Sequence, residues 1–206
     1  EWFSKHQEAD GRWSGKNFDA SCGKCDGEAE IDADAAMTGI VLLCYLGAGH
    51  THVADGPYRE PVTKALKWLV DRQASSGDLR RGETMYGQTL STVALCEALA
   101  MTKDQKLTAP TRRAVNFVLQ TAARQGGGRE AIREEDTSVL GWLVMTVESA
   151  RRAGIVVPRD VFEGAGKWLG QASSSGAPGR YSYVRGGPAS AAMTAEAMFV
   201  QQILGH

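Results

Sequence analysis

Residues 61–101, PVTKALKWLVDRQASSGDLRRGETMYGQTLSTVALCEALAM, contain two different helix patterns joined by a glycine-containing loop. The first pattern, 61–73, places apolar residues at i, i+3, i+4 and i+7 opposite charged ones, which predicts a helix with one face in water. Those apolar residues are Val62, Ala65, Leu66 and Leu69. The second pattern, 88–101, is apolar on nearly every side, and such a helix must be buried on nearly every side.

The same two patterns recur along the 206 residues of the chain. Further amphipathic segments lie at 110–123 and 158–172, and further apolar segments at 35–47, 138–150 and 189–204. A proline stands near the start of three amphipathic segments, in the first turn that tolerates its missing N–H. These prolines are Pro61, Pro110 and Pro158. We therefore expect about four helix-pair repeats, at approximately 1–50, 58–102, 108–154 and 158–206, within a single domain 1–206.

Alternating half-exposed and enclosed helices favour an all-α fold with two layers. In such a fold amphipathic helices pack outside apolar ones, and tandem pairs that curve close into a barrel or an arc. The alternative is an open solenoid, whose helices would show more similar one-sided stripes.

Short sequence motifs between the predicted helices resemble those of a known protein family. Residues 7–13, QEADGRW, combine Gln, a Gly turn and a closing Trp, and this segment resembles the repeat of the prenyltransferase and squalene-cyclase superfamily. The second repeat keeps Gln73 and Gly77-Asp78 but has Leu79 in place of Trp, and the later repeats are more degenerate. The resemblance implies an α/α toroid with more helix pairs than four. We therefore expect an incomplete ring or a piece of a longer chain, with ends that pack against further repeats or self-associate.

Composition excludes two classes of partner. The formal net charge is -1, which provides no general attraction to nucleic acid. No apolar run reaches the roughly 18 residues that a transmembrane helix needs.

The loops between amphipathic and apolar helices should gather at one end, beside helix N-termini that favour anions. Their Arg and Tyr side chains could bind a diphosphate, a carboxylate or a glycan, and the alternative is that they are simply solvated. The candidate ligand-binding residues are Arg80, Arg81, Tyr86, Arg129, Arg180, Tyr181 and Tyr183.

Three carboxylates are candidate catalytic acids by resemblance. Squalene-type cyclases protonate their substrate with an Asp of a DxDD motif at an inner-helix start. Asp34 and the pair Glu135 and Asp136 occupy partial versions of that motif. The alternative for Asp34 and Asp136 is helix capping, because a carboxylate there accepts otherwise unpaired backbone N–H bonds.

The cysteines do not by themselves predict a metal site. Cys22 and Cys25 form a CxxC motif, but a structural zinc usually needs a second CxxC or a His pair, and the sequence indicates no such partner. A loop disulfide or ordinary thiols are the expected state. Cys44 and Cys96 lie in apolar segments and are expected to be buried. We expect no metal and no cofactor.

Three functions remain open at this point. The degenerate motifs favour a non-catalytic binding or scaffold module that takes a small apolar, diphosphate or glycan ligand. A terpene cyclase or prenyltransferase completed by residues outside this chain is the first alternative. A carbohydrate-active α/α-barrel lyase or hydrolase is the second.

Overall fold

The computed structural model describes residues 1–205 except 24, 26–28, 30, 126–136, 174, 175 and 177, and gives no side-chain placement for 122–125. The described residues form eight α-helices, and their only β pairing consists of isolated bridges. The all-α prediction is therefore confirmed. The helices are α1 (Trp2–Lys5), α2 (Asp34–Gly47), α3 (Arg59–Arg72), α4 (Met85–Thr102), α5 (Gln105–Gln125), α6 (Thr137–Arg152), α7 (Arg159–Ala172) and α8 (Ala191–Leu204).

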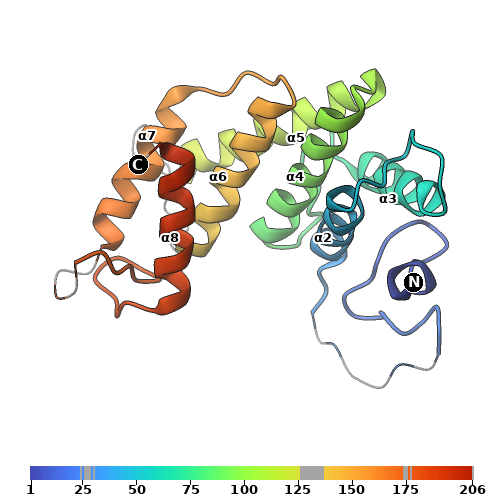
Figure 1. Cartoon of the computed structure of the whole chain (residues 1–206), viewed down its shortest axis with the longest axis horizontal. Coiled ribbons are helices and arrows are strands. Elements are labelled where there is room, and N and C mark those ends of the chain that lie inside the picture. Colours follow the sequence, from blue (N-terminus) through green and yellow to red (C-terminus); the bar gives the residue numbers. More distant parts are fainter. Residues whose placement is uncertain are drawn as a thin grey trace.

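The four apolar helices follow one another in space. Helix α2 packs on α4, α4 on α6, and α6 on α8. The amphipathic helices flank this row: α3 packs on α2, α5 on α4 and α6, and α7 on α6 and α8. Together they form an arch, with α2 and α3 towards one end and α7 and α8 at the other (Figure 1).

Close helix packing in the first half of the arch depends on small and apolar residues. A Cβ atom added to Gly39 of α2 would lie 2.8 Å from the carbonyl carbon of Leu90, so α2 and α4 approach backbone to backbone there. Leu42 and Leu95 are fully buried in the core between these helices. Each such leucine contributes roughly 1.5–3 kcal/mol relative to an exposed one.

Successive outer helices are joined by the same hydrogen bond. The Gln7 side-chain Nε2 donates to the Pro61 carbonyl at 2.8 Å, and Gln73 Nε2 donates to the Pro110 carbonyl at 2.9 Å. In each case the glutamine that follows one helix bonds to the helix of the next repeat. Pro61 and Pro110 therefore occupy equivalent places in the two contacts.

The glycine after each glutamine also repeats its environment. Gly11 and Gly77 have φ of +102° and +97°. A Cβ atom on Gly11 would lie 2.5 Å from the Lys64 carbonyl oxygen, and one on Gly77 would lie 2.6 Å from the Arg113 carbonyl carbon. Both turns therefore press directly on the backbone of the next outer helix, and a side chain there would force the two repeats apart.

Three expectations about these segments were wrong. Pro110 lies inside α5, five residues after its start, because the helix begins earlier than the apolar pattern indicated. Cys44 is exposed, since it lies on the side of α2 that faces away from α4. Helix α8 is apolar but not enclosed: Met198 and Phe199 are 61% and 43% exposed, because no further described helix packs on that side.

Candidate functional site

The N-terminal end of α2 is closed by a carboxylate from the loop before α4. Glu83 accepts the Ala35 N–H at 2.9 Å and the Ala36 N–H at 3.3 Å. Its side chain is 9% exposed. Gly87 allows this position, because a Cβ there would lie 2.7 Å from the Glu83 carboxylate. The chain thus places its own anion at the positive end of α2.

Arg72 is the partner of Glu83 on the other side. Its Nη2 atom lies 3.3 Å from the Glu83 carboxylate and also donates to the Arg80 carbonyl at 3.0 Å. The guanidinium lies 4.3 Å above the centre of the Trp68 ring, a cation–π contact. Burial raises the pKa of Glu83, against the opposing effect of the Ala35 N–H and of Arg72, and burial lowers the pKa of Arg72. Both shifts come from loss of water around a charged pair.

Asp34, the candidate acid, is engaged by residues of the first loop. Its carboxylate accepts the Gly15 N–H at 3.1 Å and lies 3.3 Å from Arg12 Nε. It does not cap its own helix, whose first free N–H groups are taken by Glu83. The capping alternative therefore assigned the wrong carboxylate to α2. Glu135 and Asp136 lie outside the described residues.

The arginines and tyrosine of the second loop also bond within the chain. Arg80 pairs with Asp78 at 3.2 Å and its guanidinium lies over the Phe117 ring. Arg81 Nε donates to the Arg72 carbonyl at 2.7 Å. The Tyr86 hydroxyl lies 2.6 Å from Ser138 Oγ, which links α4 to α6.

The remaining candidate ligand-binding residues that the structure describes belong to the loop before α8. Tyr181 is buried, and its hydroxyl accepts a hydrogen bond from Gln201 of α8 at 2.8 Å. Tyr183 and Arg180 are exposed, and Arg129 lies outside the described residues. The described candidates thus come from two segments, and both segments contact the first turn of α6, where Tyr86 bonds to Ser138 and the Tyr183 carbonyl accepts the Thr137 N–H at 2.9 Å.

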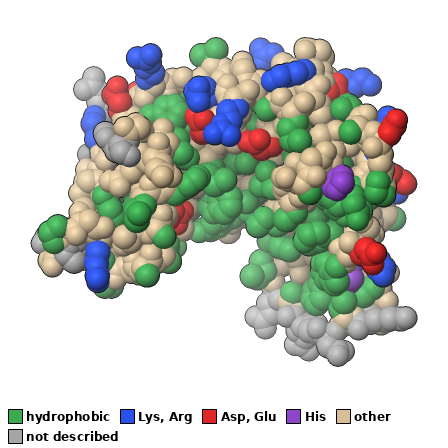
Figure 2. All heavy atoms as spheres, in the orientation of Figure 1, with side chains coloured by type: hydrophobic (Ala, Val, Ile, Leu, Met, Phe, Trp, Pro, Cys, Tyr) green, Lys and Arg blue, Asp and Glu red, His purple; other side chains and the backbone are tan. Residues whose placement is uncertain are grey.

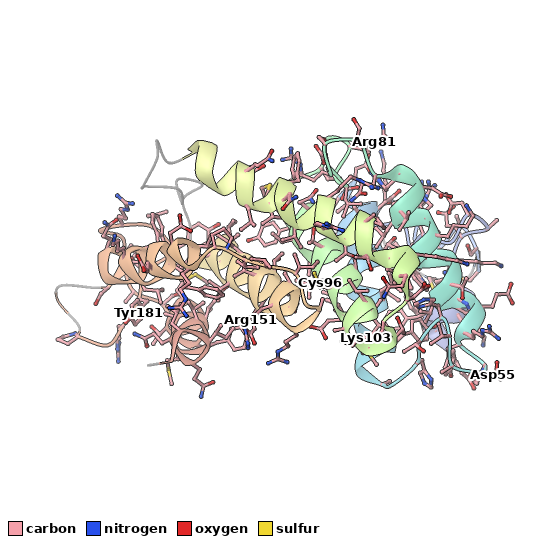
Figure 3. All side chains as sticks on the ribbon, turned by 90° about the horizontal axis from the view of Figure 1, so that it is seen from above. Asp55, Arg81, Cys96, Lys103, Arg151 and Tyr181 are labelled. Carbon is pink, nitrogen blue, oxygen red and sulfur yellow. The ribbon has the colours of Figure 1, made fainter. Side chains whose placement is uncertain are left out.

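An open groove lies at the opposite end of the inner helices, where α4, α6 and α8 end and α7 begins. Its volume is about 700 Å³. Arg81, before α4, lies on one side of the molecule, whereas Lys103 and Arg151, at the ends of α4 and α6, lie on the other (Figure 3). The groove has an apolar lining made of Met145, Phe162, Phe199, Ile203 and Leu204.

The charged edge of this groove is internally paired. Arg151 and Arg152 contact Glu148 at 2.8 and 3.0 Å, and their hydrogen bonds hold the pKa of Glu148 below its ordinary value. Glu97 accepts a hydrogen bond from Ser149 at 2.6 Å. The groove therefore offers an apolar surface next to an edge where positive and negative side chains largely balance each other. Sequence reasoning missed it because residues from four helices form it.

A second feature that sequence reasoning missed is a cluster of possible metal ligands beside α1. His6 Nε2 lies 3.0 Å from Cys25 Sγ, and the sulfurs of Cys22 and Cys25 lie 3.4 Å apart. The three donor atoms lie within 4.8 Å of one another. The hydrogen bond from Cys22 raises the pKa of the Cys25 thiol, with desolvation adding to the effect. The histidine that lies beside the CxxC motif is 19 residues before Cys25, which is why the sequence did not indicate it.

Comparisons with known proteins give no further assignment: no family model, no curated protein and no solved structure matches the chain. Across the described ranges, none of the helices combines the length and the apolarity needed to cross a membrane.

Proposed function

We propose that the chain is a prenyltransferase/squalene-cyclase-like repeat domain, part of an α/α toroid, that acts as a non-catalytic binding module. The repeated Gln–Pro hydrogen bonds of Gln7 and Gln73 support the toroid, because they join successive outer helices in one consistent geometry. Met198 on α8 is 61% exposed, and we place the contact with a further repeat or a second copy there, outside the groove.

The observation that carries the non-catalytic assignment comes from the described residues: both carboxylates at the N-terminus of α2 are bound within the chain. An acid that protonates an alkene must be desolvated and available to the substrate. Asp34 bonds to the Gly15 N–H and to Arg12, and Glu83 bonds to the start of α2 and to Arg72. Both groups therefore hold the fold together rather than face a substrate.

The groove at the opposite end is the site we assign to the ligand. Five of its eleven lining residues are large and apolar and the other six are polar or charged, and ligand sites generally combine apolar walls with polar groups. Because Arg151 and Arg152 are already paired with Glu148, the groove favours a small apolar ligand over a diphosphate. Apart from the groove, hydrophobic side chains also gather along the hollow of the arch, as Figure 2 shows.

A thermal-shift comparison tests this assignment. We expect an isoprenoid alcohol to raise the Tm of the wild type, since a ligand that binds only the folded state stabilises it. The same alcohol should have no effect on Phe199→Glu, because the charge enters the groove. Met198→Glu is the matched control, as Met198 lies next to Phe199 on α8 but does not line the groove.

Two results would contradict the proposal. One is an equal Tm shift in Phe199→Glu and wild type, which would place the ligand elsewhere. The other is release of diphosphate when the protein is incubated with the corresponding isoprenoid diphosphate, which would make the domain an enzyme. A shift with a neutral oligosaccharide and not with the alcohol would favour the carbohydrate alternative.

A further inference from the structure

We infer that His6, Cys22 and Cys25 form a zinc-binding site that fastens α1 to the loop leading into α2. The site is separate from the groove, which lies beside α6 and α8. Thiolate sulfur and imidazole nitrogen are the donor types that Zn²⁺ prefers in proteins.

The hydrogen bond at the other ring nitrogen determines which nitrogen of His6 can bind the ion. His6 Nδ1 lies 2.7 Å from the Trp2 carbonyl oxygen. A carbonyl oxygen only accepts, so Nδ1 carries the proton and the lone pair of the neutral ring is on Nε2. Nε2 is the atom that faces Cys25. Orientation of a histidine ligand by a backbone carbonyl is a usual feature of zinc sites.

The packing around His6 holds the ring in this orientation. The ring is 5% exposed, and the Trp2 ring stacks on it with centroids 3.7 Å apart and an interplanar angle of 13°. A solvated loop histidine would rotate freely, whereas this one has a fixed tautomer and a fixed direction. A preorganised ligand of this kind reduces the ordering that metal binding would otherwise require.

The separations of the donor atoms suit a tetrahedral ion after a small adjustment. Zinc–sulfur bonds of about 2.3 Å and zinc–nitrogen bonds of about 2.0–2.1 Å place tetrahedral sulfurs about 3.8 Å apart and sulfur and nitrogen about 3.5 Å apart. The corresponding separations are 3.4 Å between the sulfurs and 3.0 Å between His6 Nε2 and Cys25 Sγ. The ligands would move apart by about half an ångström, which a loop can allow. Three protein ligands leave the fourth position to water.

Binding would proceed by proton release. Each cysteine gives up its thiol proton to solvent as its sulfur bonds to Zn²⁺, and His6 binds through the lone pair of its neutral ring. No oxidant is needed and no sulfur changes oxidation state. The competing chemistry is a Cys22–Cys25 disulfide, which would remove both sulfur ligands.

The test is zinc titration of the reduced protein against a chromogenic chelator, with Co²⁺ as a spectroscopic probe. We expect about one Zn²⁺ per chain and a thiolate-to-cobalt charge-transfer band with tetrahedral d–d bands. Cys22→Ser, Cys25→Ser and His6→Ala should each weaken binding at least about 100-fold, because loss of an outer-shell partner alone costs 10–100-fold. Cys44→Ser is the matched control, since Cys44 is an exposed cysteine of α2 outside the cluster.

A further variant distinguishes the loss of a metal ligand from misfolding of the protein. His6→Cys offers a third sulfur and should retain Co²⁺ with a stronger charge-transfer band. The inference is overturned if the reduced wild type binds zinc no more tightly than Cys22→Ser. It is also overturned if the cobalt spectrum lacks thiolate charge transfer, or if zinc leaves Cys22 and Cys25 as open to alkylation as in the metal-free protein.

Discussion

Replacement of Gly77 by Ala measures how strongly successive repeats depend on a close backbone contact. Gly77 has φ of +97°, which an L-residue adopts at a cost of roughly 1–2 kcal/mol. The new Cβ would also lie 2.6 Å from the Arg113 carbonyl carbon, which belongs to the backbone of α5 and cannot rotate away. Overpacking of this kind costs roughly 1–3 kcal/mol. The total expected loss is about 2–5 kcal/mol in the free energy of unfolding, measured by urea denaturation.

Gly82→Ala provides a control with nearly the same backbone angle. Gly82 has φ of +104° and no atom within 4 Å of an added Cβ. This substitution carries the strain of the positive φ without the clash, so we expect a loss of about 1–2 kcal/mol. The difference between the two variants isolates the contact between the Gly77 turn and α5. Equal losses in the two variants would refute the claim that this contact holds the repeats together.

Three further substitutions test other contacts, each by the free energy of unfolding. Glu83→Ala should cost about 3–5 kcal/mol, because α2 loses its cap and Arg72 loses its partner in a largely buried pair. Burial raises the pKa of Glu83 in the folded protein. The free energy of unfolding of the wild type should therefore fall relative to that of Glu83→Gln as the pH rises from below the ordinary glutamate pKa to above the raised pKa of Glu83. A difference in stability between the two proteins that does not change with pH would contradict the assigned burial. Gln73→Ala should cost roughly 1–2 kcal/mol by removing the bond to Pro110 and the bonds from Arg113 of the same helix, whereas the exposed Gln120→Ala should cost under about 0.5 kcal/mol. If the two glutamine variants lose equal stability, the Gln–Pro bond is not a repeat contact. Trp168→Ala should cost about 3–5 kcal/mol because the ring is 4% exposed, and a loss below 1 kcal/mol would rule out its core role.

The helices could be predicted from sequence because their signal is local. The expected apolar segments 35–47 and 88–101 correspond to α2 at Asp34–Gly47 and α4 at Met85–Thr102. Hydrophobic periodicity reports which face of a helix avoids water, and it extends over the helix itself. It does not report what covers that face. For this reason α8 was expected to be enclosed, whereas Phe199 is 43% exposed.

The site could not be predicted in the same way because its contacts join distant segments. Glu83 caps a helix 48 residues earlier in the chain, and a search for caps within the first turn finds Asp34 instead. A useful signal was available: Ala33 precedes α2 and has no side chain that could accept a hydrogen bond, so the cap had to come from elsewhere. Likewise, His6 could be matched with the CxxC only after α1 and its loop were placed together.

These contacts also decide what could bind at the N-terminus of α2. An inner-helix N-terminus attracts an anion, and in this chain Glu83 supplies that anion at α2. A diphosphate placed there would have to displace a carboxylate that is also paired with Arg72, and would leave that carboxylate buried without its partners. Removal of one partner of a buried pair typically costs several kcal/mol, so the exchange is unfavourable. This is the reason for proposing that the ligand binds in the groove at the opposite end, whose apolar lining, in the described part of the chain, holds no buried carboxylate pair of this kind.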